Sequence, residues 1–323
     1  METRAKWGEL IPDVGLRITE MYDQGDMLYT PGIANLLKVV PMDKAQENFT
    51  GKTSFGELKK FEDGDAIPEV KRDKTYNTST YAKNYGGYVE VTKNQVEDRD
   101  FDAELNEFKD ISRSANFSVD KSGIQVYNGA FATTSSINGY DVDMYGDGVP
   151  TCSTVHPTVV AGASTQSNAS ATGIKLSVDN YETADLALEN QNQDNGLPIT
   201  MTGTTTLVTS DYLQRKGMEI TMSEKNPENA NNVINVFKGS FDMVTTKLLN
   251  GSGTNGGSNT QWFLVKRGDA KLFHKERQAK QLHSSVDGKT LTTTFAVEAR
   301  WTNAVLDWRG VWGSKGDLAA YAS

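Results

Sequence analysis

The tripeptide Gly51-Lys52-Thr53 is the stretch whose residue types most resemble a site for chemistry. Phosphate-binding loops end in Gly-Lys followed by Ser or Thr, where the Lys contacts phosphate groups and the hydroxyl group binds magnesium. The full motif needs a second Gly five residues earlier, but Gln46 occupies that position. Pro41 and the residues around it do not indicate a strand leading into such a loop. We therefore predict neither a nucleotide site nor a cofactor here.

Two other segments contain metal-ligating residue types, and both lack part of the ligand set. Residues 141–148 resemble the start of a calcium loop, but the fifth and twelfth positions are Tyr145 and Cys152. A calcium loop needs oxygen ligands there, with a Glu at the end. Cys152 and His156 could bind zinc, but a third and a fourth ligand are missing, since the other two histidines are distant in sequence. We predict no metal site.

Catalytic motifs are equally incomplete. The chain has three histidines and contains neither a Gly-x-Ser-x-Gly elbow nor a His-Glu-x-x-His pair. Acidic pairs are common in a chain with 42 Asp and Glu residues, so no glycosidase pair can be identified from them. The sequence therefore predicts a protein that is not an enzyme.

The composition predicts a soluble protein without a membrane segment. Of the 323 residues, 37% are hydrophobic, and no run is long and apolar enough to span a membrane. The first residues lack an apolar signal peptide, so we expect synthesis in a cytosol. The single cysteine, Cys152, excludes a disulfide within the chain. The net charge of −9 lacks the basic footprint of a protein that grips nucleic acid.

The first third of the chain predicts an arm, a charged hairpin and a long helix. Residues 1–47 contain four Gly and three Pro, so we expect an extended arm with at most one short helix. Residues 50–80 are highly charged, and Asp63-Gly64 is a turn signal between two extended runs. Residues 87–92 alternate like a half-buried strand. After a cap at Asp98 or Asp100, an apolar stripe predicts a helix of about five turns. Its members are Phe101, Leu105, Phe108, Ile111, Ala115 and Val119.

The middle of the chain predicts alternating helices and strands, which together with the hairpin indicate an α+β fold. We expect irregular structure over residues 123–154, followed by a helix from a cap at Ser177 to a stop at Gly196. A strand at residues 204–208, a helix at 211–222 capped by Ser210, and a strand at 232–237 complete this part.

The last part of the chain predicts buried strands. A Gly-rich loop at residues 251–259 precedes a buried strand at 262–265. A later strand has strict period two, and its buried face comprises Leu291, Thr293, Phe295, Val297, Ala299 and Trp301. Trp308 and Trp312 follow, either as core residues or as an association patch.

This order of parts resembles the major capsid proteins of tailed bacteriophages, which have the Hong Kong 97 fold. The resemblance covers nearly the whole chain and lies in the order of the parts. It includes the arm, the charged hairpin near residues 54–81, and the strand that leads through Glu97-Asp98 into the long helix. It continues through the helix that ends in residues 191–199 to the last period-two strand.

The resemblance implies a structural protein that assembles into hexamers and pentamers of an icosahedral shell around double-stranded DNA, built in the host cytoplasm. Implied partners are further copies, a scaffolding protein, a portal and decoration proteins, with the packaged DNA held only by proximity. The chain shows no charge-rich helical scaffolding region, so a separate scaffolding protein or earlier cleavage is expected. The implied parts are an N-terminal arm (1–49), an extended loop (50–86), a peripheral-domain strand with spine helix (87–134), an axial domain (135–250) and peripheral C-terminal strands (251–323).

The resemblance also assigns the candidate contact residues between subunits, which are Lys59, Lys60, Phe61, Asp63, Arg72, Lys74 and Tyr76. Gly51 would supply a turn at the foot of the loop, and Lys52 would keep an exposed strand edge soluble. Two alternatives stay open, namely an encapsulin-type cargo shell and a β-rich phage tail or adhesin module.

Some members of this family join a loop Lys to a peripheral-domain Asn with help from a carboxylate. Residues 298 and 303 are Glu and Asn, but five residues apart on one strand they point to opposite faces. We therefore predict no such cross-link; the candidates would be Lys59, Lys60, Lys71 and Lys74 with Asn303 and Glu298.

Overall fold

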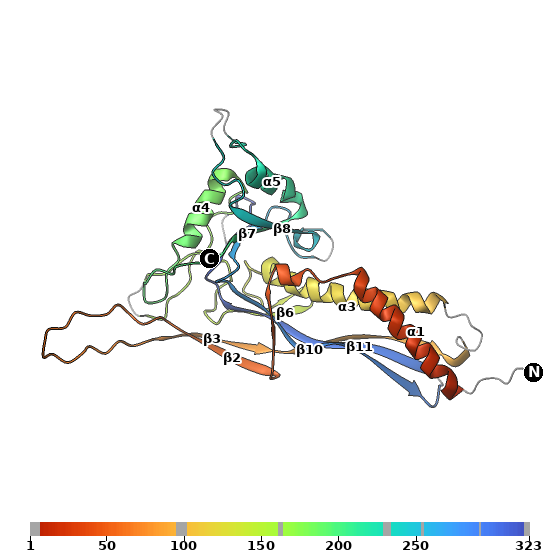
Figure 1. Cartoon of the computed structure of the whole chain (residues 1–323). Helices are drawn as coiled ribbons and strands as arrows, with labels where there is room; N and C mark the ends of the chain where they lie inside the picture. The colour runs from red at the N-terminus through yellow and green to blue at the C-terminus, as the bar shows by residue number, and fades with distance from the viewer. Residues whose placement is uncertain are drawn as a thin grey trace, which may run out of the picture.

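The structure is a computed structural model that describes residues 7–94, 102–160, 164–228, 234–252, 255–290 and 292–319. A long, flat lower half carries a smaller unit above it, and an extended loop leaves the body on the side away from the N-terminus (Figure 1). The helices are α1 (Trp7–Leu28), η1 (Ile33–Asn35), α3 (Asp102–Asn128), α4 (Val178–Glu189), η2 (Asp211–Leu213), α5 (Gln214–Met222) and η3 (Lys247–Leu249). The strands are β1 (Lys38–Pro41), β2 (Gln46–Lys52), β3 (Lys74–Tyr81), β4 (Lys83–Thr92), β5 (Ser136–Ile137), β6 (Tyr140–Asp143), β7 (Thr205–Ser210), β8 (Phe241–Thr246), β9 (Trp262–Lys266), β10 (Lys271–Asp287), β11 (Thr292–Asp307) and β12 (Val311–Ser314).

The larger sheet is built around the long antiparallel hairpin of β10 and β11. Its strand order is β1-β10-β11-β6-β5, and β4 also pairs antiparallel with β11. The predicted period-two strand is confirmed in β11, where one face is buried and the other is half-exposed. The buried residues of that face are Thr293, Phe295, Val297, Ala299 and Trp301, while Leu291 lies outside the described residues. Sequence analysis missed β10, because its Lys, Arg, Gln and His residues give little apolar alternation.

Helix α3 lies over the larger sheet and is longer than the sequence predicted. Phe108 is fully buried and packs edge-on against Phe295 of β11, with ring centroids 5.2 Å apart. The helix does not become irregular at Gly123 but continues to Asn128. A side chain at Gly123 would lie 2.4 Å from the Ile33 side chain, so this Gly permits close packing inside the helix. The candidate caps, and the side chains of Phe101 and Leu105, lie outside the described residues.

Helix α1 contradicts the prediction that residues 1–47 are mainly extended. It is a helix of 22 residues that contacts α3 and runs obliquely to it (Figure 1). Ile18 joins a buried cluster with Phe108 and Phe295. A Cβ atom at Gly25 would lie 2.4 Å from the Lys109 carbonyl oxygen, so Gly is needed for this close helix contact. The Gly content that suggested an arm therefore serves helix packing.

The smaller sheet has the order β12-β9-β7-β8 and is flanked by α4 and α5. Ser177 caps α4 as predicted, since its side chain accepts a hydrogen bond from the Asn180 backbone N–H. Trp308 and Trp312 are both buried, so the core alternative is correct for these two aromatics. The predicted strand at residues 262–265 is confirmed as β9, which is buried along its whole length.

Three boundaries in this unit differ from prediction. Helix α4 ends at Glu189, well before Gly196. Ser210 does not cap the following helix, because its hydroxyl donates to the Asn259 carbonyl oxygen instead. The strand predicted at 232–237 is wrong over residues 235–237, which are irregular or in a turn, and the strand β8 follows them, parallel to β7.

Candidate inter-subunit surfaces

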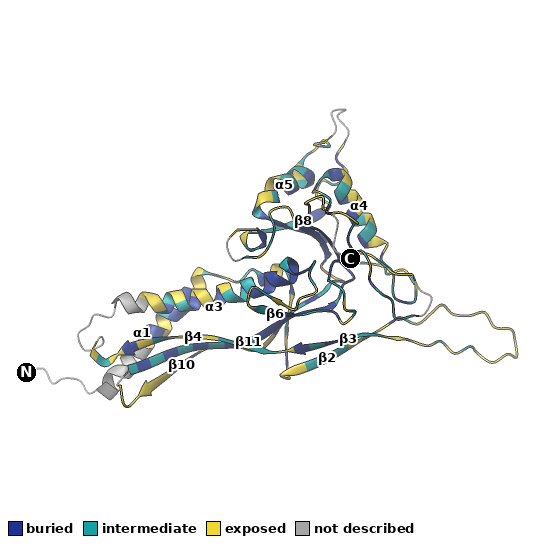
Figure 2. Cartoon of the chain, turned by 180° about the vertical axis from the view of Figure 1, so that it is seen from behind, coloured by how far each residue is buried: buried dark blue, intermediate teal, exposed yellow. Residues whose placement is uncertain are grey.

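The segment between β2 and β3, residues 53–73, is exposed over most of its length and is called the extended loop from here on. Strands β2 and β3 pair only below it, and both sides of the loop then run on without a ladder between them. The predicted turn at Asp63-Gly64 is present, because Gly64 has a φ of +91° and the Asp65 N–H donates to the Glu62 carbonyl. Figure 2 shows the loop exposed along nearly its whole length.

The loop exposes apolar side chains that its own chain does not cover. Leu58 is 89% exposed and Ile67 is 79% exposed. Phe55 is 59% exposed and Phe61 is 50% exposed. Apolar groups left in water on an ordered loop favour burial against a partner, since burial releases about 25 cal/mol for each Å². The loop is therefore a candidate contact surface.

The seven predicted contact residues divide into three groups in the structure. Lys59, Lys60, Phe61 and Asp63 lie on the exposed outer part of the loop. Arg72 and Lys74 lie at its root, where the Arg72 Nε donates to the Thr53 carbonyl and the guanidinium covers the Phe55 ring. Tyr76 instead packs within its own subunit, edge-on to Tyr145 at 5.8 Å.

A second exposed surface lies at the top of the smaller unit, and sequence analysis did not find it. Ile234 and Val236 are each 77% exposed, and Met222 at the end of α5 is 64% exposed. Tyr212 in η2 is exposed as well. The signal available in the sequence was Asn232-Val233-Ile234-Asn235-Val236, which was interpreted as part of a strand.

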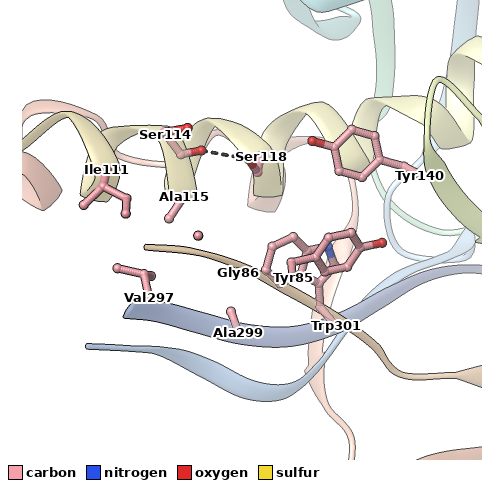
Figure 3. Close-up of a pocket in the computed structure, with 11 residues that line it drawn as sticks. Tyr85, Gly86, Ile111, Ser114, Ala115, Ser118, Tyr140, Val297, Ala299 and Trp301 are labelled. Atoms are coloured by element: carbon pink, nitrogen blue, oxygen red, sulfur yellow. Dashed lines mark hydrogen bonds between the residues drawn. The ribbon is translucent and has the colours of Figure 1, made fainter. Parts of the chain in front are cut away.

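The larger sheet offers a hollow between α3 and β4 (Figure 3). This cavity of about 280 Å³ is lined by Gly86 and Gly87 on the strand and by Ile111 and Ala115 on the helix. Tyr85 closes one end, stacked on Trp301 with ring centroids 4.1 Å apart. A Cβ atom at Gly87 would lie 3.9 Å from Ile111 Cδ1, so the missing side chain at Gly87 helps to keep the space open. A Cβ atom at Gly86 would instead lie 2.9 Å from the Val297 carbonyl oxygen, so this Gly permits the close approach of β4 and β11.

The segments with catalytic or metal-ligating residue types have structural partners instead. At Gly51-Lys52-Thr53 the Thr53 N–H donates to the Asp73 carbonyl, so these backbone groups form no phosphate cradle. Gly51 is not in a turn but at a register shift in β2. His156 pairs with Asp147 at 2.8 Å, and both side chains are almost fully buried. Among the described residues no group of three or more His, Cys, Asp or Glu could hold a metal ion.

Both ring nitrogens of His156 lie within hydrogen-bond distance of side-chain oxygens. Its Nδ1 faces a carboxylate oxygen of Asp147, and its Nε2 lies 3.0 Å from Asn168 Oδ1. That Asn168 atom also accepts the Ser153 N–H, so it must be the oxygen of the amide. The ring also stacks on Trp308, with ring centroids 4.1 Å apart. This buried pair ties the loop after β6 to the core.

The candidate cross-linking groups do not converge within the subunit. Asn303 is fully buried, with its Oδ1 2.7 Å from His274 Nδ1. Glu298 lies on the opposite, half-exposed face of β11. Lys60 is exposed and paired with Glu62 at 2.9 Å.

In the part of the chain that the structure describes, no helix is long and apolar enough to cross a membrane.

Residues 75–314 match a family model described as phage capsid protein. A search of curated protein sequences found no match.

Solved structures with a similar fold include three capsids. The capsid of Ralstonia phage GP4 has a TM-score of 0.53 at 12% identity, covering 89% of this chain and 88% of the other. The capsid of the cyanophage P-SCSP1u has a TM-score of 0.53 at 9% identity, with 86% and 85% covered. The capsid of an empty GTA particle has a TM-score of 0.52 at 13% identity, with 91% of each chain covered. The chain therefore belongs to the phage capsid protein family and is a structural major capsid protein with the α+β fold of the Hong Kong 97 type.

Proposed function

We propose that the extended loop binds a neighbouring copy of the chain and so joins subunits into hexamers and pentamers of an icosahedral shell around double-stranded DNA. The observation that carries this proposal is the row of exposed apolar side chains at Phe55, Leu58, Phe61 and Ile67 on an ordered loop. The loop reaches beyond the body of its own subunit (Figure 1), so a neighbour can cover it. Lys59, Lys60, Asp63, Arg72 and Lys74 would add polar contacts around this apolar row.

The exposed top of the smaller unit supports a second contact of the same kind. With Ile234 and Val236 exposed at one end and the loop at the other, each subunit has two separate contact surfaces. Several weak contacts made by one rigid subunit act together, because forming the first raises the effective concentration for the next. We assign the top to an axial domain over residues 135–250, and the larger sheet with α3 to a peripheral domain.

The charge of the chain supports a container and does not support a DNA-binding surface. A net charge of −9 disfavours tight contact with phosphate groups, so the packaged DNA would be held by confinement. The proposal includes assembly in the host cytoplasm with a separate scaffolding protein, a portal and decoration proteins, and it includes no enzymatic activity.

The proposal is tested by removing the outer loop while keeping its root. We predict that replacing residues 57–70 by a short Gly-Ser linker leaves a soluble subunit with an unchanged circular dichroism spectrum that forms no shells in negative-stain microscopy. The reason is that this segment contributes little to the buried core but most of the apolar contact surface.

A triple substitution separates apolar contact from loop length. Leu58→Ser, Phe61→Ser and Ile67→Ser together should reduce shell yield at least tenfold, since three apolar contacts are lost. The matched control is Glu69→Ser with Lys71→Ser, which removes an exposed ion pair of little energetic value on the same loop. Normal shells from the triple variant would contradict the proposal.

A further inference from the structure

Residues 193–195, here called the clamp turn, hold the root of the extended loop through side chains. The Gln193 side-chain oxygen accepts the Ser54 backbone N–H at 2.7 Å. The Asn195 Nδ2 donates to the Ser54 carbonyl oxygen at 3.3 Å. Both backbone polar groups of one loop residue are thus bound by two side chains of the smaller unit, which fixes the orientation of the chain as it enters the loop.

The clamp turn is itself anchored in the core. Between its two gripping residues, Asp194 forms an ion pair with Arg309 at 2.6 Å, and both side chains are at most 9% exposed. Arg309 also donates from Nε to the Asn192 carbonyl, and its guanidinium covers the Trp308 ring. Removing one partner of a buried ion pair is strongly destabilising, so this anchor is rigid under native conditions.

A second anchor holds the turn from the other side. The Gln166 side chain donates to the Gln193 carbonyl at 3.3 Å and accepts the Asn192 N–H at 2.9 Å. The returning side of the loop is bound to the same root, because the Asp73 N–H donates to Thr53 Oγ1 at 3.0 Å. Both sides of the loop are therefore fixed relative to the clamp turn before any neighbour is present.

We propose that the clamp turn sets the direction in which the extended loop leaves the subunit. A loop held at a fixed angle loses less conformational entropy when it meets a neighbour than a freely moving loop does. The angle of the loop also fixes the angle between adjoining subunits, so the clamp turn limits the curvature of the assembly. This last step rests on the function proposed above, whereas the positioning of the loop does not.

Two substitutions that add the same charge separate this role from a general effect on the surface. Gln193→Glu keeps an oxygen that accepts the Ser54 N–H. Asn195→Asp keeps the oxygen that accepts the Leu197 N–H at 3.2 Å but loses the group that donates to Ser54. We expect Asn195→Asp to loosen the loop root and Gln193→Glu to leave it fixed. Asn190→Ala is a further control, since its side chain, just after α4, donates to the Leu186 carbonyl oxygen and not to the loop root.

The direction of the loop is measured on dilute, unassembled subunits by pulsed electron paramagnetic resonance, which gives the distance between two spin labels. Spin labels are attached through Asp63→Cys at the loop tip and Asp179→Cys on α4, both exposed positions. The native Cys152 is buried and stays unlabelled. The distance distribution should be narrow in the parent and in Gln193→Glu and at least twice as wide in Asn195→Asp.

Limited trypsin digestion gives an independent measure of the root. Cleavage after Arg72 should become about fivefold faster in Asn195→Asp, the factor expected for one lost hydrogen bond. Cleavage after Lys60 at the tip should not change. Gln193→Leu removes the oxygen that accepts the Ser54 N–H. If Asn195→Asp and Gln193→Leu both show the distance distribution and the rate of cleavage after Arg72 of the parent, the proposal that the clamp turn positions the loop is wrong. A loosened loop that still forms normal shells would leave the positioning of the loop intact but contradict the inference that the clamp turn limits curvature. The contact role of the loop is tested separately by the triple Ser variant.

Discussion

The extended loop and helix α3 use apolar side chains for opposite purposes. Leu58 and Ile67 of the loop are almost fully exposed, whereas Phe108, Ile124 and Tyr127 of α3 are almost fully buried against the subunit's own core. The buried face of the helix should therefore contribute to the folding free energy, and the loop should contribute almost none. In an assembling protein, the apolar surface left outside the fold remains available for association.

The first way to break this comparison is to place a charge in the buried region. Phe108→Asp should make the protein insoluble, because an unpaired buried carboxylate costs several kcal/mol, comparable with the stability of a domain. The control is Ser114→Asp on the exposed side of the same helix, which should stay soluble. Soluble Phe108→Asp with native circular dichroism would show that α3 is not packed as described.

The buried pair of His156 and Asp147 gives the next largest effect. Asp147→Ala leaves the buried His156 Nδ1 without its hydrogen-bond partner, and we expect a loss of about 1–3 kcal/mol in the free energy of unfolding. Asp141→Ala removes an exposed partner of Lys83 and should cost less than about 1 kcal/mol. Urea unfolding followed by fluorescence measures both; equal values would mean that the His156 pair contributes no more than a surface pair.

Elements that depend on local chemistry could be predicted from the sequence, and elements that depend on distant contacts could not. The period-two face of β11, the Ser177 cap of α4 and the turn at Gly64 were predicted because each depends on local chemistry. Helix α1 was missed because its Gly25 is required by the contact with Lys109, and a distant contact leaves no local signal. For the same reason Gly123 was interpreted as a helix end.

The candidate contact surface was only partly predictable. The charge and the lack of aliphatic residues identified the loop that carries Lys59, Lys60 and Asp63. The ring of Tyr76, another predicted contact residue, lies against Tyr145 in the body of the subunit. The clamp residues Gln193 and Asn195 are about 140 residues from Ser54, so only the folded chain brings them together.

A smaller, pH-dependent effect is expected where the ribbon of β2 and β3 meets the larger sheet. The hydrogen bond from Lys275 lowers the pKa of Glu47 below its ordinary value of 4.5. A lowered pKa in the folded state stabilises the protein at pH values above 4.5, and the contribution is lost as the pH falls through the folded value. Glu47→Gln should therefore cost up to about 1 kcal/mol at pH 7 and progressively less below pH 4.5.

Urea unfolding between pH 3 and pH 7 measures this dependence. Glu62→Gln is the matched control, since its pair with Lys60 is exposed on the loop and should change stability at no pH. If Glu47→Gln lowers the free energy of unfolding by the same amount at every pH in this range, the Lys275 contact does not link the pKa of Glu47 to folding.

The last prediction is that no covalent bond forms between the extended loop and a neighbouring subunit. Cross-linking needs a loop Lys beside the Asn303 carbonyl with a carboxylate close by. Asn303 is fully buried and bonded to His274, and Glu298 lies on the other face of β11. A neighbour's Lys59 or Lys60 would have to open the sheet to reach it, so the shell should be held by non-covalent contacts alone. Boiled particles on a denaturing gel should give one band near 35.4 kDa. A ladder of larger species that disappears in Asn303→Ala would show instead that the loop reaches into the buried region, and the contrast between the two regions would fail there.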